Sequence, residues 1–137
     1  MRERLTDEEA NSFCGDMFQQ LGVQSSEADI CSRALVQTSL RGVDSHGILS
    51  MPIYAERIRS GQIKPGGAVR VLRESSSTLF CDGEHGLGPV LAMEVAERVV
   101  DRAKESGLAA ASLVNGNYVG ALAPYVEQIA YRGMLGI

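Results

Sequence analysis

The first part of the chain carries apolar residues at the spacing of amphipathic helices. Thr6 and Glu9 form a Ser/Thr-x-x-Glu capping box, which satisfies free backbone groups at the start of a helix. Phe13, Met17 and Leu21 follow at helical spacing, so they lie on one face. The pattern predicts a first helix that is ended by the next residue, a glycine.

Two more helices are predicted before the pattern changes. Ser25-Ser26-Glu27 restarts the helical spacing, and the short loop before it predicts that this second helix runs antiparallel to the first. The residues on its apolar face are Ile30, Ala34, Leu35 and Thr38. A third helix is predicted from Ile48 to Arg59. Pro52 does not prevent this helix, because it falls near the first turn, where proline is tolerated.

Lys64-Pro65-Gly66-Gly67 is a linker at which the apolar period changes from about four to about two. We therefore place a domain boundary there, with a helical domain over residues 1–64 and an α/β domain over residues 65–137. The elements predicted after the boundary are a hairpin of strands at 69–73 and 78–81, a long helix over 90–105, a buried strand over 108–114 and a helix over 122–132.

Met134 to Ile137 form a β-like apolar run directly after the last predicted helix. Such a run leads us to expect that the second domain continues in a longer parent protein, so that the α/β unit here is truncated. The alternative is a complete small α/β unit whose last strand ends the chain. In both cases the fold class is α/β, with helices first and an α/β unit second.

Composition limits the classes of partner and the cellular compartment that we expect for this chain. The 137 residues are 45% hydrophobic and 22% charged, which is typical of a soluble globular protein, and the net charge of -4 leaves no broad basic surface for nucleic acid. No apolar run approaches the ~20 residues of a membrane span, so no membrane association is expected. Cys14, Cys31 and Cys81 are widely spaced and form no CxxC pair, which indicates reduced core thiols and a cytoplasmic protein.

The run from Arg41 to Gly47 places a histidine between two glycines, just before the third predicted helix. Histidine has the only unperturbed side-chain pKa near neutrality, so His46 is a candidate acid/base group that Ser45 or Asp44 orients. The simpler alternative is that Asp44 or Ser45 caps the next helix and that His46 has no role. A hydrolytic Ser45–His46 dyad is not expected, because sequence neighbours point in different directions.

A second glycine cluster, Gly83-x-x-Gly86-x-Gly88, precedes the long predicted helix. Its spacing is reversed relative to the dinucleotide fingerprint G-x-G-x-x-G, so it favours a tight strand-to-helix connection with positive φ values over a phosphate loop. His85 in this loop is expected to be a surface residue. With two isolated histidines and no cysteine pair, the sequence predicts no metal site.

Residues Asn115 to Leu122 have the pattern of a strand end, a glycine turn and a helix start. Such a turn exposes backbone N–H groups that can bind an anion. Many α/β loops share this pattern without binding anything, so both interpretations stay open from the residues alone.

Several segments, taken in order, resemble one family over essentially the whole chain. They are Gly42-Val43-Asp44-Ser45-His46-Gly47, Pro52-x-Tyr54, Gly61-x-Ile63, Asp82-Gly83-x-x-Gly86-x-Gly88, Ala92-Met93 and the turn from Asn115 to Leu122. Together they resemble the N-terminal portion of the malate/L-lactate dehydrogenase family. This family includes ureidoglycolate dehydrogenase and piperideine-2-carboxylate reductase, and it is unrelated to the Rossmann-type lactate and malate enzymes.

The resemblance implies an oxidoreductase that uses NAD or NADP and acts on 2-hydroxy acids, 2-keto acids or related imino acids. It also implies an intertwined homodimer with a helical domain and a non-Rossmann cofactor domain, of which residues 65–137 form a part. In the family pattern His46 is the acid/base, and Ser45 and Asp44 are its supports. The residues that the resemblance places against the nicotinamide cofactor are Gly120, Ala121 and Leu122.

Two positions depart from the family pattern. The histidine of the family turn Asn-Ser-x-His-Phe-Gly is replaced by Tyr118, and an arginine that would bind the substrate carboxylate, four positions after the first histidine, is Ser50. These departures favour an alternative, a degenerate relative that acts as a dimerisation or binding module. A hydrolase using Ser45 is a more distant alternative. Because the family chain is longer, we expect the isolated chain to be weakly active or inactive.

Overall fold

The elements of the chain run from a group of helices to a small sheet, in a computed structural model that describes residues 4–137. The first part contains α1 (Asp7–Gln20), α2 (Ser25–Leu40), the 3₁₀ turns η1 (Asp44–His46) and η2 (Ile48–Ser50), and α3 (Met51–Arg59). The second part contains β1 (Arg70–Glu74), β2 (Thr78–Asp82), α4 (Gly88–Ser106), β3 (Ala110–Val114) and α5 (Ala123–Tyr131). The predicted α/β class is confirmed.

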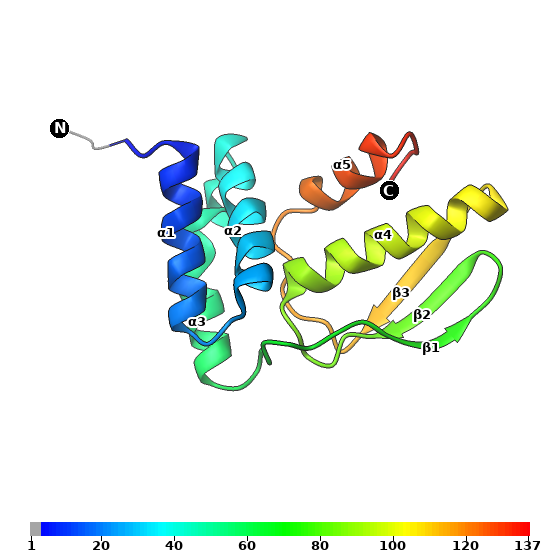
Figure 1. Ribbon diagram of the computed structural model, residues 1–137, viewed down its shortest axis with the longest axis horizontal. Helices are drawn as coiled ribbons and strands as arrows, with labels where there is room; N and C mark the ends of the chain where they lie inside the picture. The colour runs from blue at the N-terminus through cyan, green and yellow to red at the C-terminus, as the bar shows by residue number, and fades with distance from the viewer. Residues whose placement is uncertain (1–3) are drawn as a thin grey trace.

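The capping box at the start of α1 is confirmed. The Glu9 N–H donates to Thr6 Oγ1 at 3.2 Å, and the Thr6 N–H donates to the Glu9 carboxylate at 2.8 Å. Figure 1 shows α2 returning antiparallel beside α1, as the short loop predicts. The buried face of α1 differs from the one that the spacing indicates, because Phe13 is 54% exposed. The buried residues of α1 are Ala10, Cys14, Gly15 and Phe18.

The third helix begins later than predicted. Residues 48–50 form η2, and α3 covers Met51–Arg59. The reason is a close contact with α2: a Cβ at Gly47 would lie 2.1 Å from Ser39 Oγ, and the Ile48 N–H donates to that same oxygen at 3.0 Å. Because α2 holds the chain at Gly47 and Ile48, the segment enters α3 through two short 3₁₀ turns.

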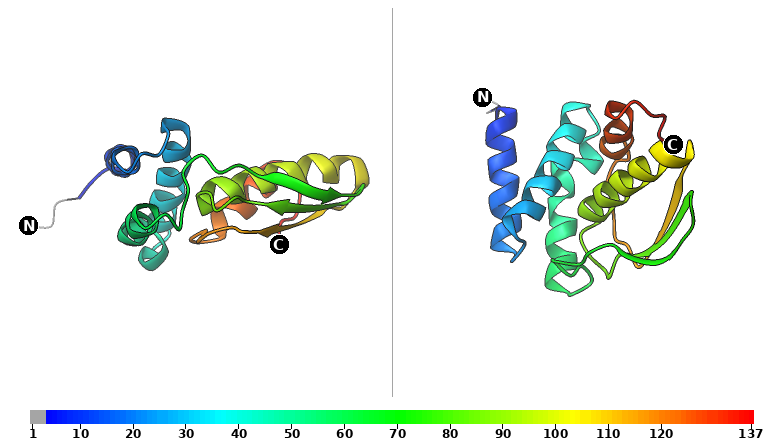
Figure 2. Two further views of the ribbon diagram at one scale, coloured as in Figure 1. Left: turned by 90° about the horizontal axis from the view of Figure 1, so that it is seen from below. Right: turned by 45° about the vertical axis from the view of Figure 1, so that its right-hand side comes forward.

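The sheet has the strand order β1-β2-β3, and the predicted hairpin is confirmed because β1 and β2 pair antiparallel. Strand β3 pairs parallel to β2, and α4 makes the crossover between them. Figures 1 and 2 show α4 lying along one face of this sheet. Leu79 and Cys81 of β2 pack with Leu91 of α4 in a core that is separate from the core between α1, α2 and α3.

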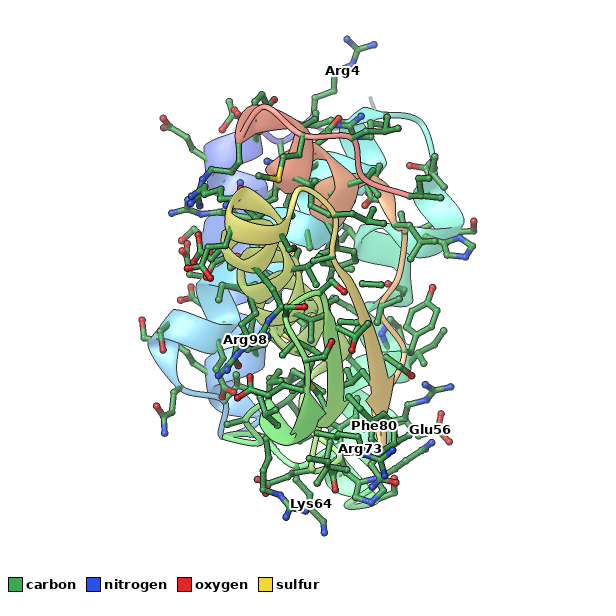
Figure 3. All side chains as sticks on the ribbon, turned by 90° about the vertical axis from the view of Figure 1, so that its right-hand side faces the viewer. Arg4, Glu56, Lys64, Arg73, Phe80 and Arg98 are labelled. Atoms are coloured by element: carbon green, nitrogen blue, oxygen red, sulfur yellow. The ribbon has the colours of Figure 1, made fainter. Side chains whose placement is uncertain are left out.

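The prediction of a buried strand over 108–114 is wrong in part. Leu108 lies outside β3 and is 76% exposed, and burial alternates along β3. Within residues 4–137, only one face of the sheet is covered by a helix, so residues pointing to the other face stay accessible. Figure 3 shows Phe80 and its cross-strand partner Arg73 together, whereas Arg98 projects from α4.

Residues 134–137 form no strand, which corrects the expected β-like run. The Met134 N–H donates to the Ile129 carbonyl at 3.3 Å, so the chain turns back on α5. No strand of residues 4–137 lies beside this segment to pair with it.

The three cysteines are free and buried, as predicted. Burial raises the pKa of all three thiols, to the greatest extent at Cys31. Among the helices of residues 4–137, none combines the length and the apolar character that crossing a membrane requires.

Candidate active site

The loop between α2 and α3 presents His46 at the surface. Backbone bonds from His46 N–H to the Val43 carbonyl and from Gly47 N–H to the Asp44 carbonyl, each 3.1 Å, close η1 and hold the histidine backbone. Neither Asp44 nor Ser45 caps the next helix, because α3 begins with no side-chain cap bond. The expected cap is therefore absent, whereas the role of His46 stays a prediction.

Ser45 and His46 contact each other directly. Ser45 Oγ lies 2.9 Å from His46 Nδ1, so the expectation that these neighbours point apart is wrong. Both side chains are exposed on a short 3₁₀ turn, where packing does not fix their directions and the serine hydroxyl can bend back to the ring. The contact occupies Nδ1 and leaves Nε2 for another partner.

The Asp44 carboxylate plays no comparable part in this geometry. In the described residues 4–137, no hydrogen bond or ion pair joins it to the His46 ring. Ser50, four positions after His46, is also turned away from the surface. It is 1% exposed, and its hydroxyl donates to the Gly47 carbonyl at 2.7 Å, so it stabilises the turn.

The fold brings the turn after β3 against His46. The rings of His46 and Tyr118 lie 6.1 Å apart between centroids, and those of Tyr54 and Tyr118 lie 5.7 Å apart. Tyr54 is fully buried, and its hydroxyl donates to the Tyr118 carbonyl at 3.4 Å. Burial is the main cause that raises the pKa of Tyr54, so its hydroxyl stays protonated. Tyr54 thus anchors Tyr118 beside the histidine.

The segment expected to contact a cofactor begins beside the same turn. Gly120 has a φ of 71°, and a Cβ there would lie 3.5 Å from the His46 carbonyl oxygen and 3.6 Å from the Tyr54 hydroxyl. The buried Tyr125 donates its hydroxyl to the Val119 carbonyl at 2.5 Å and so fixes the segment from its other side. Burial raises the pKa of Tyr125 as well.

Backbone donors in this segment are unused. Within the part of the chain that the structure describes, no N–H group from residue 118 to residue 122 donates to a protein acceptor. Ala121 is half-buried, whereas Leu122 is 65% exposed at the start of α5. A loop with free N–H groups and a glycine beside a histidine fits the amide and polar groups of a nicotinamide cofactor.

The glycines of the second cluster lack the positive φ values that the sequence predicts for them. Its positive φ values fall on Glu84 and His85, at 51° and 61°, and not on its glycines. Gly88 is needed for close approach, because a Cβ there would lie 2.1 Å from the Tyr118 carbonyl oxygen. His85 is exposed, as predicted. This loop therefore supports the turn at Tyr118 through its backbone.

Asn117 is a structural residue that the sequence pattern did not identify as one. Its side-chain amide donates to the carbonyls of His85 at 2.9 Å, Gln62 at 3.2 Å and Gly86 at 3.3 Å. Its partners come from two distant segments, so no local signal in the sequence could have identified it. Arg57 was also missed, and its Cζ lies 5.6 Å from the Tyr118 ring centroid. Tyr54 and Arg57 share a face of α3, which the helical spacing could have indicated.

The chain is similar to proteins of one known family. A sequence profile described as malate/L-lactate dehydrogenase matches residues 5–137. The chain is 34% identical over 126 residues to a malate dehydrogenase of Pyrococcus horikoshii, covering 92% of this chain and 35% of that protein. It is 30% identical over 138 residues to a (2R)-3-sulfolactate dehydrogenase (NADP(+)) of Chromohalobacter salexigens, covering 100% of this chain and 41% of that protein.

The structural comparison gives the same result. The solved structure of the Pyrococcus horikoshii malate dehydrogenase superimposes with a TM-score of 0.93 at 32% identity, covering 96% of this chain and 38% of that one. The chain belongs to the malate/L-lactate dehydrogenase family, which confirms the resemblance seen in its motifs. It spans well under half the length of these relatives.

Proposed function

We propose that this chain is the N-terminal portion of an NAD(P)-dependent dehydrogenase that interconverts 2-hydroxy acids and 2-keto acids, or related imino acids. The observation that carries the proposal is the grouping of Ser45, His46 and Tyr118 next to the Gly120 segment, in a chain of this family. The names of the relatives, malate dehydrogenase and sulfolactate dehydrogenase, support a 2-hydroxy acid as substrate.

The role of His46 follows from its free nitrogen. When Nδ1–H donates to Ser45 Oγ, the neutral ring leaves Nε2 unprotonated as the base, and the imidazolium carries a second proton on Nε2 as the acid. Reduction of a 2-keto acid adds a hydride to C2 and leaves negative charge on the C2 oxygen, which takes the Nε2 proton. In the reverse direction Nε2 accepts the hydroxyl proton as the hydride leaves C2. Ser45 supports this role by holding the ring. The family resemblance gives Asp44 a supporting role as well, although no hydrogen bond of residues 4–137 joins its carboxylate to the ring.

The cofactor proposal concerns the segment of Gly120, Ala121 and Leu122. A bound NAD or NADP supplies or accepts the hydride, and the free backbone N–H groups of residues 118–122 would hold its nicotinamide end beside His46. The same proposal divides the chain into a helical domain of residues 1–64 and a partial cofactor domain of residues 65–137. Most residues of one core lie before residue 65 and all residues of the other lie after it, which supports this division.

The wider setting is also proposed. A homodimer is supported by large exposed apolar side chains near the site, with Leu49 72% exposed and Leu122 65% exposed. Buried free thiols support a reducing, cytoplasmic location. Neither a nucleic acid nor a metal is part of the proposal, and residues 4–137 contain no group of three or more metal-ligating side chains.

The test is NAD(P)H oxidation with a panel of 2-keto acids, using the chain and any longer reading frame that contains it. We expect weak or no turnover by the 137-residue chain. In an active longer form, His46→Gln lowers kcat by about 10²–10⁴-fold, the usual contribution of a general acid. His85→Gln is the matched control and leaves kcat unchanged. Equal kcat for the His46 variant and the unaltered protein would contradict the proposal.

A degenerate relative that acts as a dimerisation or binding module is the second candidate, because Tyr118 and Ser50 stand where the family pattern has a histidine and an arginine. The two candidates differ in cofactor binding. Nicotinamide binding that weakens in Gly120→Val supports the dehydrogenase, and the absence of both binding and turnover in a full-length form supports the module.

A further inference from the structure

The proposed function requires a positive charge that the segment around His46 does not itself supply. A 2-keto or 2-hydroxy acid carries a carboxylate next to C2, and a carboxylate is bound most strongly by the two parallel N–H groups of an arginine. Ser50 is 1% exposed and its hydroxyl is bonded to the Gly47 carbonyl, so it cannot fill this role. The cation must come from another element that reaches the site.

Arg41, at the end of α2, is already engaged. Its guanidinium forms an ion pair with Glu127 of α5 at 2.5 Å. A guanidinium held by a carboxylate of its own chain binds a second carboxylate weakly, because its charge is already compensated.

Arg57 is free for this role. Its Cζ lies 5.6 Å from the Tyr118 ring centroid, and the Tyr118 ring lies 6.1 Å from the His46 ring. In the described residues 4–137, no carboxylate forms an ion pair with Arg57, and Figure 3 shows the neighbouring Glu56 projecting outward. Arginine stacked beside an aromatic ring keeps its N–H edge available for a planar anion.

The position of Arg57 in α3 holds its side chain beside Tyr118. Tyr54 and Arg57 are three residues apart, so they lie on the same helical face, which is the face that contacts Tyr118. Tyr54 is fully buried and holds that face in place. The positive charge of Arg57 also acts on Tyr54, where it opposes the increase of the pKa that burial causes.

We propose that Arg57 binds the carboxylate of the substrate whose C2 oxygen lies at His46 Nε2, with the Tyr118 ring beside both side chains. The inference rests on the proposed function and adds to it the origin of acid specificity. Arg57 selects substrates that carry an anion next to the reacting carbon and rejects their neutral analogues.

The test compares pyruvate with its neutral amide, pyruvamide, so that only the charge next to the keto group changes. Binding to the isotope-labelled 137-residue chain is followed by NMR at the His46 ring and at the arginine side chains. We expect the unaltered chain to bind pyruvate about tenfold more tightly than pyruvamide, the usual worth of one charge-assisted contact. Arg57→Gln abolishes this preference, and Arg57→Lys keeps part of it, since lysine retains the charge but not the bidentate geometry.

Arg59→Gln is the matched control, because Arg59 is an exposed arginine of the same helix, and it keeps the full preference. If Arg57→Gln weakens both ligands equally, Arg57 has a structural role only and the inference is wrong. If the preference survives in Arg57→Gln while pyruvate still shifts the His46 ring, the inference is wrong and the proposed function stands. Failure of the unaltered chain to favour pyruvate overturns the inference, and failure to bind either ligand also counts against the proposed function.

Discussion

Two glycine-flanked histidine loops lie in the chain, and they serve the site in opposite ways. In the loop of η1 the side chain matters: His46 is held by Ser45 at 2.9 Å and lies beside Tyr118. In the loop before α4 the backbone matters: the His85 carbonyl accepts from the Lys64 N–H at 2.8 Å and from the Asn117 amide at 2.9 Å.

The difference shows that a histidine between glycines carries no single meaning. The backbone of η1 is right-handed and regular, so it presents a ring to a partner, whereas His85 has a φ of 61°, a conformation that favours glycine. The second loop acts on the first through the turn that carries Tyr118, since Gly88 lies against the Tyr118 carbonyl and the His85 carbonyl accepts from Asn117. Four predictions test this division between presenting and supporting loops.

Gly88→Ala should have the largest effect. A Cβ at this position would lie 2.1 Å from the Tyr118 carbonyl oxygen, and backbone must move to admit it. We expect a loss of about 2–3 kcal/mol in the free energy of unfolding, measured with urea. Gly15→Ala is the control, because nothing lies within 4 Å of its Cβ in α1, and it should stabilise by about 0.5–1 kcal/mol. A neutral Gly88→Ala would refute the close approach.

Asn117→Ala should cost about 1–2 kcal/mol, because the carbonyls of His85, Gln62 and Gly86 lose a shared donor. Asn117→Asp should cost at least as much, since an ionised carboxylate cannot donate to these oxygens. Urea unfolding measures both. A milder effect of the aspartate variant than of the alanine variant would show that the amide donor does not hold these carbonyls.

His85→Gly should stabilise the chain by about 0.5–1 kcal/mol, because glycine adopts a positive φ without the steric cost that a Cβ carries. His46→Gly should instead destabilise it by a similar amount, since its backbone is already right-handed. Thermal unfolding of the two variants measures this contrast. The same sign for both would remove the distinction between the loops.

The smallest effect concerns acid pH. The Glu84 N–H, at 2.9 Å, is the main cause that holds the pKa of Asp82 below its ordinary value of 3.8, with further help from Asn115 and Arg70. A lowered pKa in the folded chain gives stability that is present above 3.8 and is lost as the pH falls through the folded value. The urea concentration at the midpoint of unfolding should therefore fall less between about pH 5 and pH 2 in Asp82→Asn than in the unaltered chain. An identical drop in both would exclude this contribution.

Local patterns in the sequence predicted the elements well, because capping and apolar spacing act over a few residues. The box at Thr6 and Glu9 and the hairpin of β1 and β2 are examples. The patterns failed where distant segments decide. Ser39 delays α3 through its bond to Ile48, and the uncovered face of the sheet leaves Leu108 and β3 accessible.

The candidate site was predicted in its members but not in its contacts. The structure brings His46, Ser45 and Gly120 near one another, and their roles stay predictions. The direction of Ser45 could not be predicted, because the rule for packed helices does not hold on an exposed turn. Arg57 was missed because its partner Tyr118 lies far along the chain.

The three buried cysteines can be used to measure local opening of the chain. Cys14 and Cys31 lie in the core between the helices, and Cys81 lies in the core under α4, each with 0% exposure. A thiol reagent can reach them only when the surrounding core opens, so the rate of labelling counts opening events. Mass spectrometry of the labelled peptides would then show whether the helical core and the sheet core open together or one at a time.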